Sequence, residues 1–278
     1  MAKKTEEVKV SDIFNMQIDN IVKEDKKGEY EVYKPSAKDG KDNNYKAIIR
    51  FIPWYKEVNK SIIDKWTVWL TNADTEESRY IDCPSTVGEP SILQKLFFDL
   101  RNSPNANERE LSQNFGRRQV FHSLIQIIND QNNPDLNGKI KVFKYGKKIY
   151  DRIKSVLKPQ EGMEEESNNI FDPFDARAFL LNIKIVAGFN NYDDSIFVSK
   201  VSPIIIDGNP VEKKKEMYPK IIKFLEENSP DLSKYDYKPW DEDTKEFVFD
   251  AIKSIIPPGK ILESLFKKTS LKEPAIVK

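Results

Sequence analysis

RRQVFHSLIQIINDQNNPDLNGKIKVFKY, residues 117–145, is the stretch that decides the fold class. Its two ends, 117–128 and 139–145, alternate β-branched or aromatic side chains with polar ones, a pattern that is typical of strands. Residues 129–138 between them are rich in Asn, Asp, Pro and Gly, which favour turns. The stretch therefore predicts two strands joined by a long loop.

Shorter runs of the same character lie on both sides of this stretch. They are YEVY at 30–33, YKAIIRFIPW at 45–54, WTVWL at 66–70, RYI at 79–81, FLLNIKIVAGF at 179–189 and SIFVSKVSPIII at 195–206. Gly, Asn, Asp and Pro separate these runs, and we expect them to form a mixed β core of roughly six or seven strands. Small, strongly curved antiparallel sheets of this kind commonly close as barrels, including the OB type.

Helical spacing of apolar residues appears at 91–100, where Ser91 is a candidate N-cap, and again at 146–158. After residue 207 the sequence is helical in character. We therefore expect a mixed β/α fold, with an OB-fold-type β-barrel core at 28–207 and interspersed helices. An N-terminal arm at 1–27, with a short helix, would precede the core, and a helical C-terminal extension at 208–278 would follow it.

The composition excludes several classes of protein. The 278 residues include one cysteine, Cys83, and one histidine, His122. A disulfide framework is thus impossible within the chain, and a Cys/His zinc site lacks ligands. No stretch has the apolar character of a signal peptide or of a membrane span, so we expect a soluble intracellular protein.

The charge is unevenly distributed although the formal net charge is zero. Residues 101–160 carry more than twice as many basic as acidic side chains, and residues 161–250 carry the opposite excess. A polyanion responds to local potential, so the basic middle is compatible with nucleic acid. From charge alone, a solvated face whose sign varies along the chain is the slightly favoured alternative.

The sequence contains no motif that indicates catalysis. It lacks the phosphate-binding loop, the GxGxxG fingerprint and the GxSxG elbow. His122 lies in an alternating strand with no Ser or Cys partner nearby in sequence. The acidic run Glu164–Glu166 has the chemistry of a nuclease metal site, but adjacent carboxylates on a loop do not converge on an ion. We therefore expect a protein that is not an enzyme.

A binding role has more support, because single-stranded nucleic acid needs cations for its phosphates and aromatic faces for its bases. In the strand 139–145, Lys139 and Lys141 share a face with Phe143 and Tyr145 under strict alternation. That face would suit bases and phosphates. The alternative, which the pattern leaves open, is that Phe143 is a core residue and the lysines protect an edge strand.

Three segments in order, KAIIRFIP at 46–53, KVFKYGKKIYDRI at 141–153 and GFNNYDDSIF at 188–197, resemble the helix-destabilising single-stranded-DNA-binding proteins of T-even bacteriophages. The resemblance covers about residues 28–205. It implies an OB-fold core with a basic, aromatic cleft that coats and protects single-stranded DNA, without sequence preference, during phage replication, recombination and repair. It also implies self-association on DNA, phage replication and recombination proteins as partners, and the cytoplasm of the infected host. A structural or interaction protein of a phage assembly is the alternative.

The resemblance carries individual positions over as DNA-binding residues. They are Arg50, Tyr80, Arg117, Arg118, Phe121, His122, Tyr145, Lys147, Lys148, Phe189 and Tyr192. Lys139 and Lys141 join them from the strand pattern. His122 stands where the family has a tryptophan, which weakens the expectation of stacking at that position.

Two features of the family are missing. Its zinc is bound by one His and three Cys, whereas here only Cys83 matches and Thr86 stands at the next ligand position. We therefore expect no zinc and no other cofactor, with Trp66, Trp69 and Leu70 packing the 60–90 region instead. In the family, an acidic C-terminal tail recruits replication partners, whereas this sequence has the basic KKTSLKEPAIVK there. The resemblance therefore does not imply how this chain would recruit partners. Lys3 and Lys4 resemble the family's N-terminal basic cluster only faintly.

Overall fold

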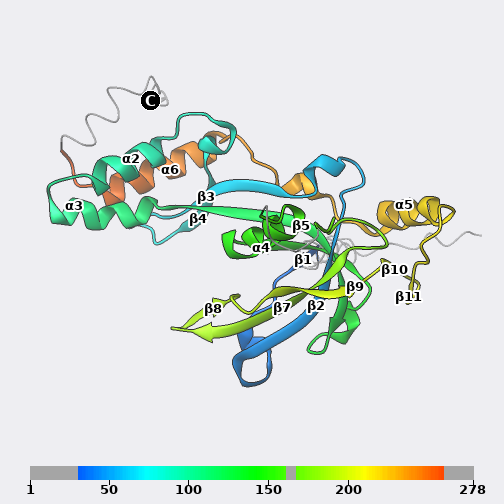
Figure 1. Ribbon diagram of the computed structural model, residues 1–278. Helices are drawn as coiled ribbons and strands as arrows, with labels where there is room; N and C mark the ends of the chain where they lie inside the picture. The colour runs from blue at the N-terminus through cyan, green and yellow to red at the C-terminus, as the bar shows by residue number, and fades with distance from the viewer. Residues whose placement is uncertain (1–30, 161–166, 260–278) are drawn as a thin grey trace, which may run out of the picture. The chain divides into compact units, whose positions relative to one another are not determined.

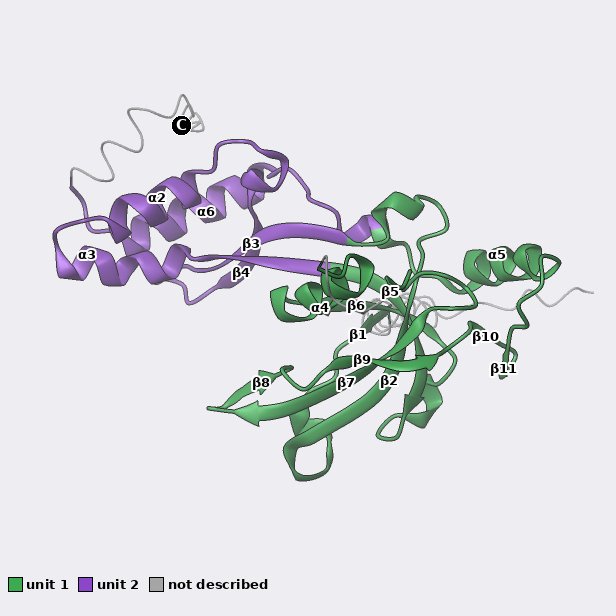
Figure 2. Ribbon diagram, viewed as in Figure 1, with its two compact units in different colours: residues 1–62, 122–232 green, residues 63–121, 233–278 purple. Residues whose placement is uncertain are grey.

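The computed structural model describes residues 31–160 and 167–259 (Figure 1). The helix predicted within the first 27 residues and the last helical segment, from 260 onward, lie outside this range. The chain forms two compact units (Figure 2), unit 1 with residues 1–62 and 122–232 and unit 2 with residues 63–121 and 233–278. The division differs from the predicted segments 28–207 and 208–278, because unit 2 combines the middle of the chain with its C-terminal part.

Unit 1 is built on a sheet with the strand order β1–β6–β5–β2–β7–β8, and β9 also pairs with β7. The strands are β1 (Val32–Tyr33), β2 (Asn44–Ile52), β5 (Arg117–Asp130, of which 122–130 belong to this unit), β6 (Ile140–Tyr145), β7 (Arg177–Val186), β8 (Phe189–Asn191) and β9 (Ile196–Val201). Strand β2 is antiparallel to both β5 and β7, whereas β1 runs parallel to β6. Strands β10 (Ile205–Ile206) and β11 (Asn209–Pro210) form a separate two-stranded sheet.

The core of unit 1 is aromatic and centres on Phe51, which is completely buried. Its ring contacts those of Tyr145, Phe171, Phe179 and Phe197, with centroids 5.9–6.5 Å apart. The last four residues of β2 are all buried, so both faces of the sheet are covered at this end. Such coverage requires other parts of the chain to pack on both sides of β2.

Helices and short 3-10 turns complete unit 1. Helix α4 (Lys147–Leu157) buries Ile149 and Ile153, and α5 (Met217–Asn228) buries Ile221 and Leu225. Both show the spacing of one apolar face, as the sequence predicts. The 3-10 turns are η1 (Ala37–Asp39), η2 (Lys41–Asn43), η3 (Val58–Lys60) and η6 (Pro134–Leu136), and η7 (Leu232–Tyr235) lies at the boundary with unit 2.

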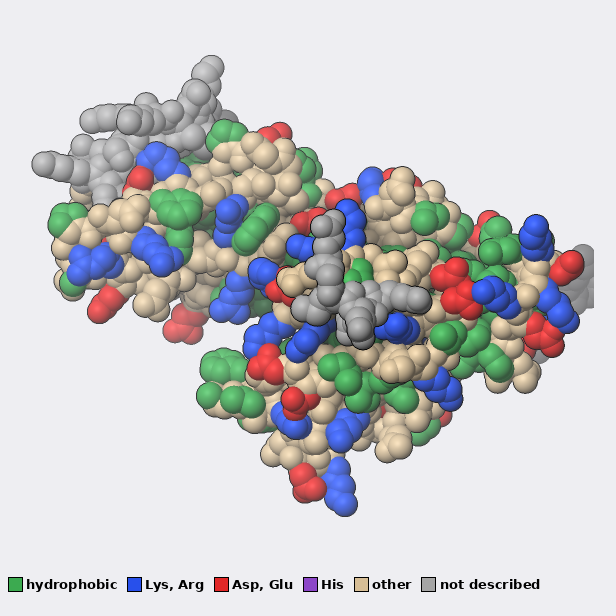
Figure 3. Space-filling view, in the orientation of Figure 1, with side chains coloured by type: hydrophobic (Ala, Val, Ile, Leu, Met, Phe, Trp, Pro, Cys, Tyr) green, Lys and Arg blue, Asp and Glu red, His purple; other side chains and the backbone are tan. Residues whose placement is uncertain are grey.

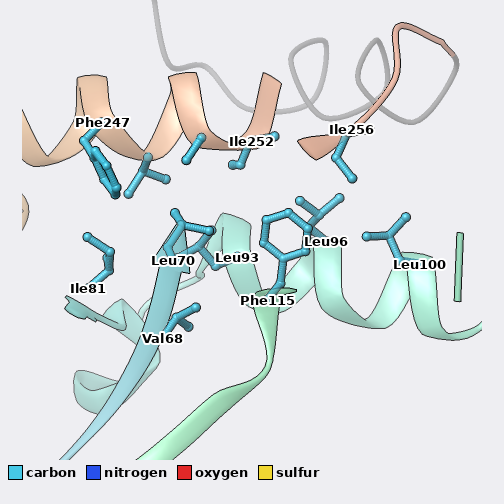
Figure 4. Close-up of a cluster of buried hydrophobic side chains, with 12 residues drawn as sticks. Val68, Leu70, Ile81, Leu93, Leu96, Leu100, Phe115, Phe247, Ile252 and Ile256 are labelled. Carbon is cyan, nitrogen blue, oxygen red and sulfur yellow. The ribbon is translucent and has the colours of Figure 1, made fainter. Parts of the chain in front are cut away.

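Unit 2 contains the hairpin of β3 (Ile63–Thr71) and β4 (Ser78–Asp82), residues 117–121 of β5, which also pairs with β3, and helices. Its other elements are η4 (Pro84–Val87), α2 (Ile92–Arg101), α3 (Ala106–Leu111), η5 (Ser112–Phe115) and α6 (Glu242–Ile255). Figure 4 shows apolar side chains of α6 directed toward those of α2 and the hairpin. The buried cluster comprises Val68, Leu70, Ile81, Leu93, Leu96, Leu100, Phe115, Phe247, Val248, Ala251, Ile252 and Ile256.

The structure confirms the mixed β/α class and the N-cap of α2, where the Ser91 side chain accepts a hydrogen bond from the Gln94 amide. Two elements differ from expectation. Helix α3, capped by Asn105, follows α2 in a region where the sequence pattern predicts no element. Helix α6 forms part of the core of unit 2, whereas the sequence places it in a C-terminal extension.

Candidate nucleic-acid interface

An exposed aromatic pair lies on the hairpin of unit 2. Trp69 on β3 stands directly opposite Tyr80 on β4, and their ring centroids are 4.4 Å apart. Alternation along β3 directs Val68 and Leu70 into the core, which leaves Trp69 on the outer face. The two side chains are 50% and 63% exposed, respectively. Base stacking requires accessible aromatic rings of this kind.

Trp69 is the residue that the sequence interpretation assigned incorrectly. It was expected to pack the 60–90 region together with Trp66 and Leu70. Leu70 does lie in the core and Trp66 is half-buried, but Trp69 is largely exposed. The alternation Val68–Trp69–Leu70 carries the relevant signal, because two neighbouring aliphatic core positions force the residue between them outward.

Arg117 and Arg118 begin β5 in unit 2. The Arg117 guanidinium lies 4.1 Å from the centroid of the Trp66 ring, and its Nη1 donates hydrogen bonds to Ser85 Oγ and Gln94 Oε1. These contacts fix the orientation of the cation. Arg118 is exposed. Unit 2 thus carries both kinds of group that a single strand requires.

The strand β6 of unit 1 resolves the alternatives that the sequence left open. Phe143 and Tyr145 are buried, and Tyr145 Oη lies 2.9 Å from Ser123 Oγ. Phe143 is therefore a core residue. The lysines do not protect an edge, however, because β6 lies between β1 and β5. Lys139 is exposed and Lys141 is half-buried.

Helix α4 presents a basic outer face, and Figure 3 shows Lys and Arg side chains gathered over it. Lys147 and Lys148 form ion pairs with Asp151 and Asp193, at 2.6 and 2.5 Å. The hydrogen bond from Lys148 holds the pKa of Asp193 below its ordinary value. Exposed ion pairs contribute little to stability, so both lysines can exchange a carboxylate for a phosphate at small cost.

Phe189 and Tyr192 lie in and just after β8, which forms a hairpin with β7. Ala187 and Gly188 form its turn with φ angles of 50° and 83°, the conformation of a tight type I′ hairpin. Phe189 is 78% exposed and pairs with Val186, which is also exposed. Tyr192 is half-buried, and its burial raises the pKa of its hydroxyl. Phe189 is therefore accessible to a base, and Tyr192 only in part.

Four of the positions carried over from the resemblance are buried, namely Arg50, Phe121, His122 and Tyr145. Arg50 donates hydrogen bonds to the backbone carbonyls of Ser202 and Asp172, and its burial lowers its pKa to about 10. These contacts hold the guanidinium inside unit 1. A DNA contact by any of these four residues stays a prediction, and we do not include them in the interface proposed below.

The residues around Cys83 do not fit the zinc site that the resemblance implies. Cys83 is buried with its Sγ 3.3 Å from Ser91 Oγ, and Thr86 Oγ1 accepts a hydrogen bond from the Trp66 amide. Within residues 31–160 and 167–259, no three His, Cys, Asp or Glu side chains converge in a group that could hold a metal. The whole chain offers a single thiol.

Known proteins that are similar to this chain identify its family. The family model described as "gp32 DNA binding protein like" matches residues 43–256, most of the chain. The chain belongs to this family. The single-stranded DNA-binding proteins of Enterobacteria phages T2 and T4 are each 26% identical to this gp32-like protein over 216 residues. The alignment covers 75% of this chain and 66% of each relative, just under two thirds of their length.

The family assignment confirms the resemblance to the T-even single-stranded-DNA-binding proteins. It also supports the prediction that the gp32-like protein is not an enzyme, since the family and both relatives are described by DNA binding. Across the described parts of the chain, no helix has both the length and the apolar character needed to cross a bilayer.

Proposed function

We propose that this gp32-like protein binds single-stranded DNA without sequence preference. The observation that carries the proposal is the exposed Trp69–Tyr80 pair on unit 2. Leaving two large aromatic rings in water is unfavourable, and such surfaces mark interaction sites. Arg117, Arg118 and the basic face of α4 supply cations for phosphates. The names of the T2 and T4 relatives support the same ligand.

Several finer statements belong to this proposal. The protein would coat and protect the strand during phage replication, recombination and repair, inside the infected host cell. Unit 1 would be an OB-fold-type barrel, and residues 1–27 would support cooperative self-association. The protein would fold without zinc. Metal analysis of the purified protein tests the last point, and stoichiometric zinc would overturn it.

Fluorescence titration with oligo-dT tests the DNA ligand directly. Trp69 is an exposed tryptophan next to Tyr80, so a stacked base should quench its emission. We expect the logarithm of the affinity to fall linearly with the logarithm of the salt concentration, and duplex DNA to bind more weakly. The variant Trp69→Phe should retain binding but lose most of the quenching. Equal affinity for duplex, or no dependence on salt, would overturn the proposal.

A further inference from the structure

A pocket of about 880 Å³ lies entirely within unit 1. Its walls come from four places: residues 32–35 at and after β1, Asp39 of η1, Tyr45 on β2, and the loop 132–136 with Lys139 and Lys141 just before and in β6. The volume falls in the range of roughly 300–1,000 Å³ that is usual for small-molecule sites. Its lining residues include Lys139 and Lys141.

The buried carboxylate of Asp130 organises this pocket. Its Oδ1 accepts hydrogen bonds from the amides of Asn132 and Asn133, at 3.0 and 3.1 Å, which fixes the course of the loop. Its Oδ2 accepts hydrogen bonds from the hydroxyls of Tyr33, at 2.9 Å, and Tyr45. The Asn133 side-chain amide donates to Tyr45 Oη. The walls are thus held in place before any ligand arrives, which lowers the entropic cost of binding.

Three lysines of the pocket can contact an anion. Lys34, Lys139 and Lys141 line the pocket, against the carboxylates of Asp39 and Asp135. Asp39 already accepts a hydrogen bond from the Ser36 amide in the capping box of η1. Burial, and then the charge of neighbouring Lys139, lower the pKa of Lys141. The charge of Glu31 acts on Lys141 in the opposite direction, and a phosphate at the two ammonium groups would add to this counter-charge.

The remaining lining groups fit a base. The tyrosine rings form the buried floor, Pro134 and Leu136 supply apolar surface, and the asparagine amides can both donate and accept hydrogen bonds. We propose that this pocket binds one nucleotide, with its phosphate at Lys139 and Lys141 and its base against Pro134 and Leu136. Insofar as that nucleotide belongs to a bound strand, the inference rests on the proposed function.

Calorimetric titration with thymidine monophosphate tests the pocket independently of the strand. We expect the wild-type protein to bind this nucleotide more tightly than either thymidine or inorganic phosphate. The double variant Lys139→Glu/Lys141→Glu should bind it at least tenfold more weakly. Lys220→Glu/Lys223→Glu on α5 is the matched control, because it makes the same charge change at exposed sites outside the pocket. Equal nucleotide affinity in the pocket variant, or none in the wild type, would overturn the proposal.

Oligo-dT titrations at several salt concentrations form the second arm. Loss of this one phosphate contact should reduce the salt slope by about 0.7, the contribution of one phosphate in a single strand. The pocket proposal is overturned if the salt slope falls equally in the pocket variant and the control variant. It is also overturned if the pocket variant binds the nucleotide as tightly as the wild type. In both cases the proposal that the protein binds a single strand is unaffected. If the wild type fails to bind oligo-dT but still binds the nucleotide, the pocket is supported and the proposed function fails.

Discussion

At the scale of single residues, the proposed binding of single-stranded DNA depends on side chains that face water. On β3 the aliphatic residues Val68 and Leu70 lie in the core, and the larger Trp69 between them is half exposed. Burying such a ring would release a substantial hydrophobic free energy. Its position opposite exposed Tyr80 is the reason why we propose this pair as a base-stacking site.

We expect Trp69→Ala and Tyr80→Ala each to weaken binding of single-stranded DNA by about 1–3 kcal/mol, the free energy of one stacked base. Fluorescence anisotropy with a labelled oligo-dT measures this loss. Phe98→Ala is the matched control, because Phe98 is a similarly exposed aromatic residue on α2 of the same unit. If all three variants bind equally well, the pair is not a stacking site.

Tyr145 should behave as a core residue. Tyr145→Ala removes a ring that packs against Phe51 and Phe143, so we expect a loss of roughly 3–5 kcal/mol in unfolding free energy. Tyr145→Phe keeps the ring but loses the hydrogen bond with Ser123, and should cost about 1 kcal/mol. Urea unfolding distinguishes the two variants. A Tyr145→Ala protein of wild-type stability would contradict the packing described for this residue.

At the scale of elements, the sequence predicts where strands and helices lie better than which face they bury. The strands 117–128 and 139–145 and the helix 146–158 match β5, β6 and α4 closely. Strict alternation nevertheless fails on β6, where four of six residues are buried. Neighbouring strands cover β6 on both edges and packing covers both faces, and neither fact is written in its local pattern.

The loop after β5 shows a second limit of the same kind. Its Asn, Pro and Gly residues predict a turn, but not that Asp130 would fix it through the hydroxyls of Tyr33 and Tyr45. Tyr33 is 97 positions away from Asp130 in the chain. A contact over such a distance leaves no local signal, so the sequence could not reveal the pocket that this contact organises.

The same cluster predicts how stability depends on pH. Burial and the hydrogen bond to Asp130 raise the pKa of Tyr45 to about 12, and burial raises that of Tyr33 further. A raised pKa in the folded state means that the stabilisation is complete below about pH 10, the ordinary value for tyrosine, and is lost as the pH rises from there through 12. The urea concentration at the midpoint of unfolding should therefore change little from pH 8 to pH 10 and fall clearly from pH 10 to pH 11.

The double variant Tyr33→Phe/Tyr45→Phe provides the comparison for this pH series. It should be less stable at pH 8, because Asp130 loses two donors, yet its midpoint should change less between pH 10 and 11. Lysine titration affects both proteins alike and cancels in the difference. Parallel curves for the two proteins would show that the tyrosine cluster does not govern the alkaline transition.

At the scale of the whole molecule, the sequence predicts the family and the fold class but not the division into units. Local periodicity identifies helical character in residues 242–255, and nothing in it specifies the partner of that helix. The Ala73 amide donates a hydrogen bond to Ser254 Oγ across 181 positions. Only the folded structure shows that α6 completes the core of unit 2.

We expect Ile252→Ala to destabilise unit 2 by about 2–5 kcal/mol, since Ile252 is completely buried in the apolar cluster. Hydrogen exchange read by mass spectrometry should show reduced protection in residues 63–121 as well as in α6. The control Ile222→Ala, half exposed on α5, should change stability by no more than about 0.5 kcal/mol. Unchanged protection of 63–121 would show that α6 is dispensable for this unit.

Helix α6 is synthesised long after the hairpin on which it packs, so it determines when unit 2 can finish folding during translation. Ribosomes add about 5–20 residues per second, so the segment 63–121 emerges on the order of ten seconds before α6. During that interval, the apolar sides of β3, β4 and α2 have no final cover. The nascent protein therefore carries an unfinished apolar surface that chaperones can bind, and unit 2 completes its fold only near the end of translation.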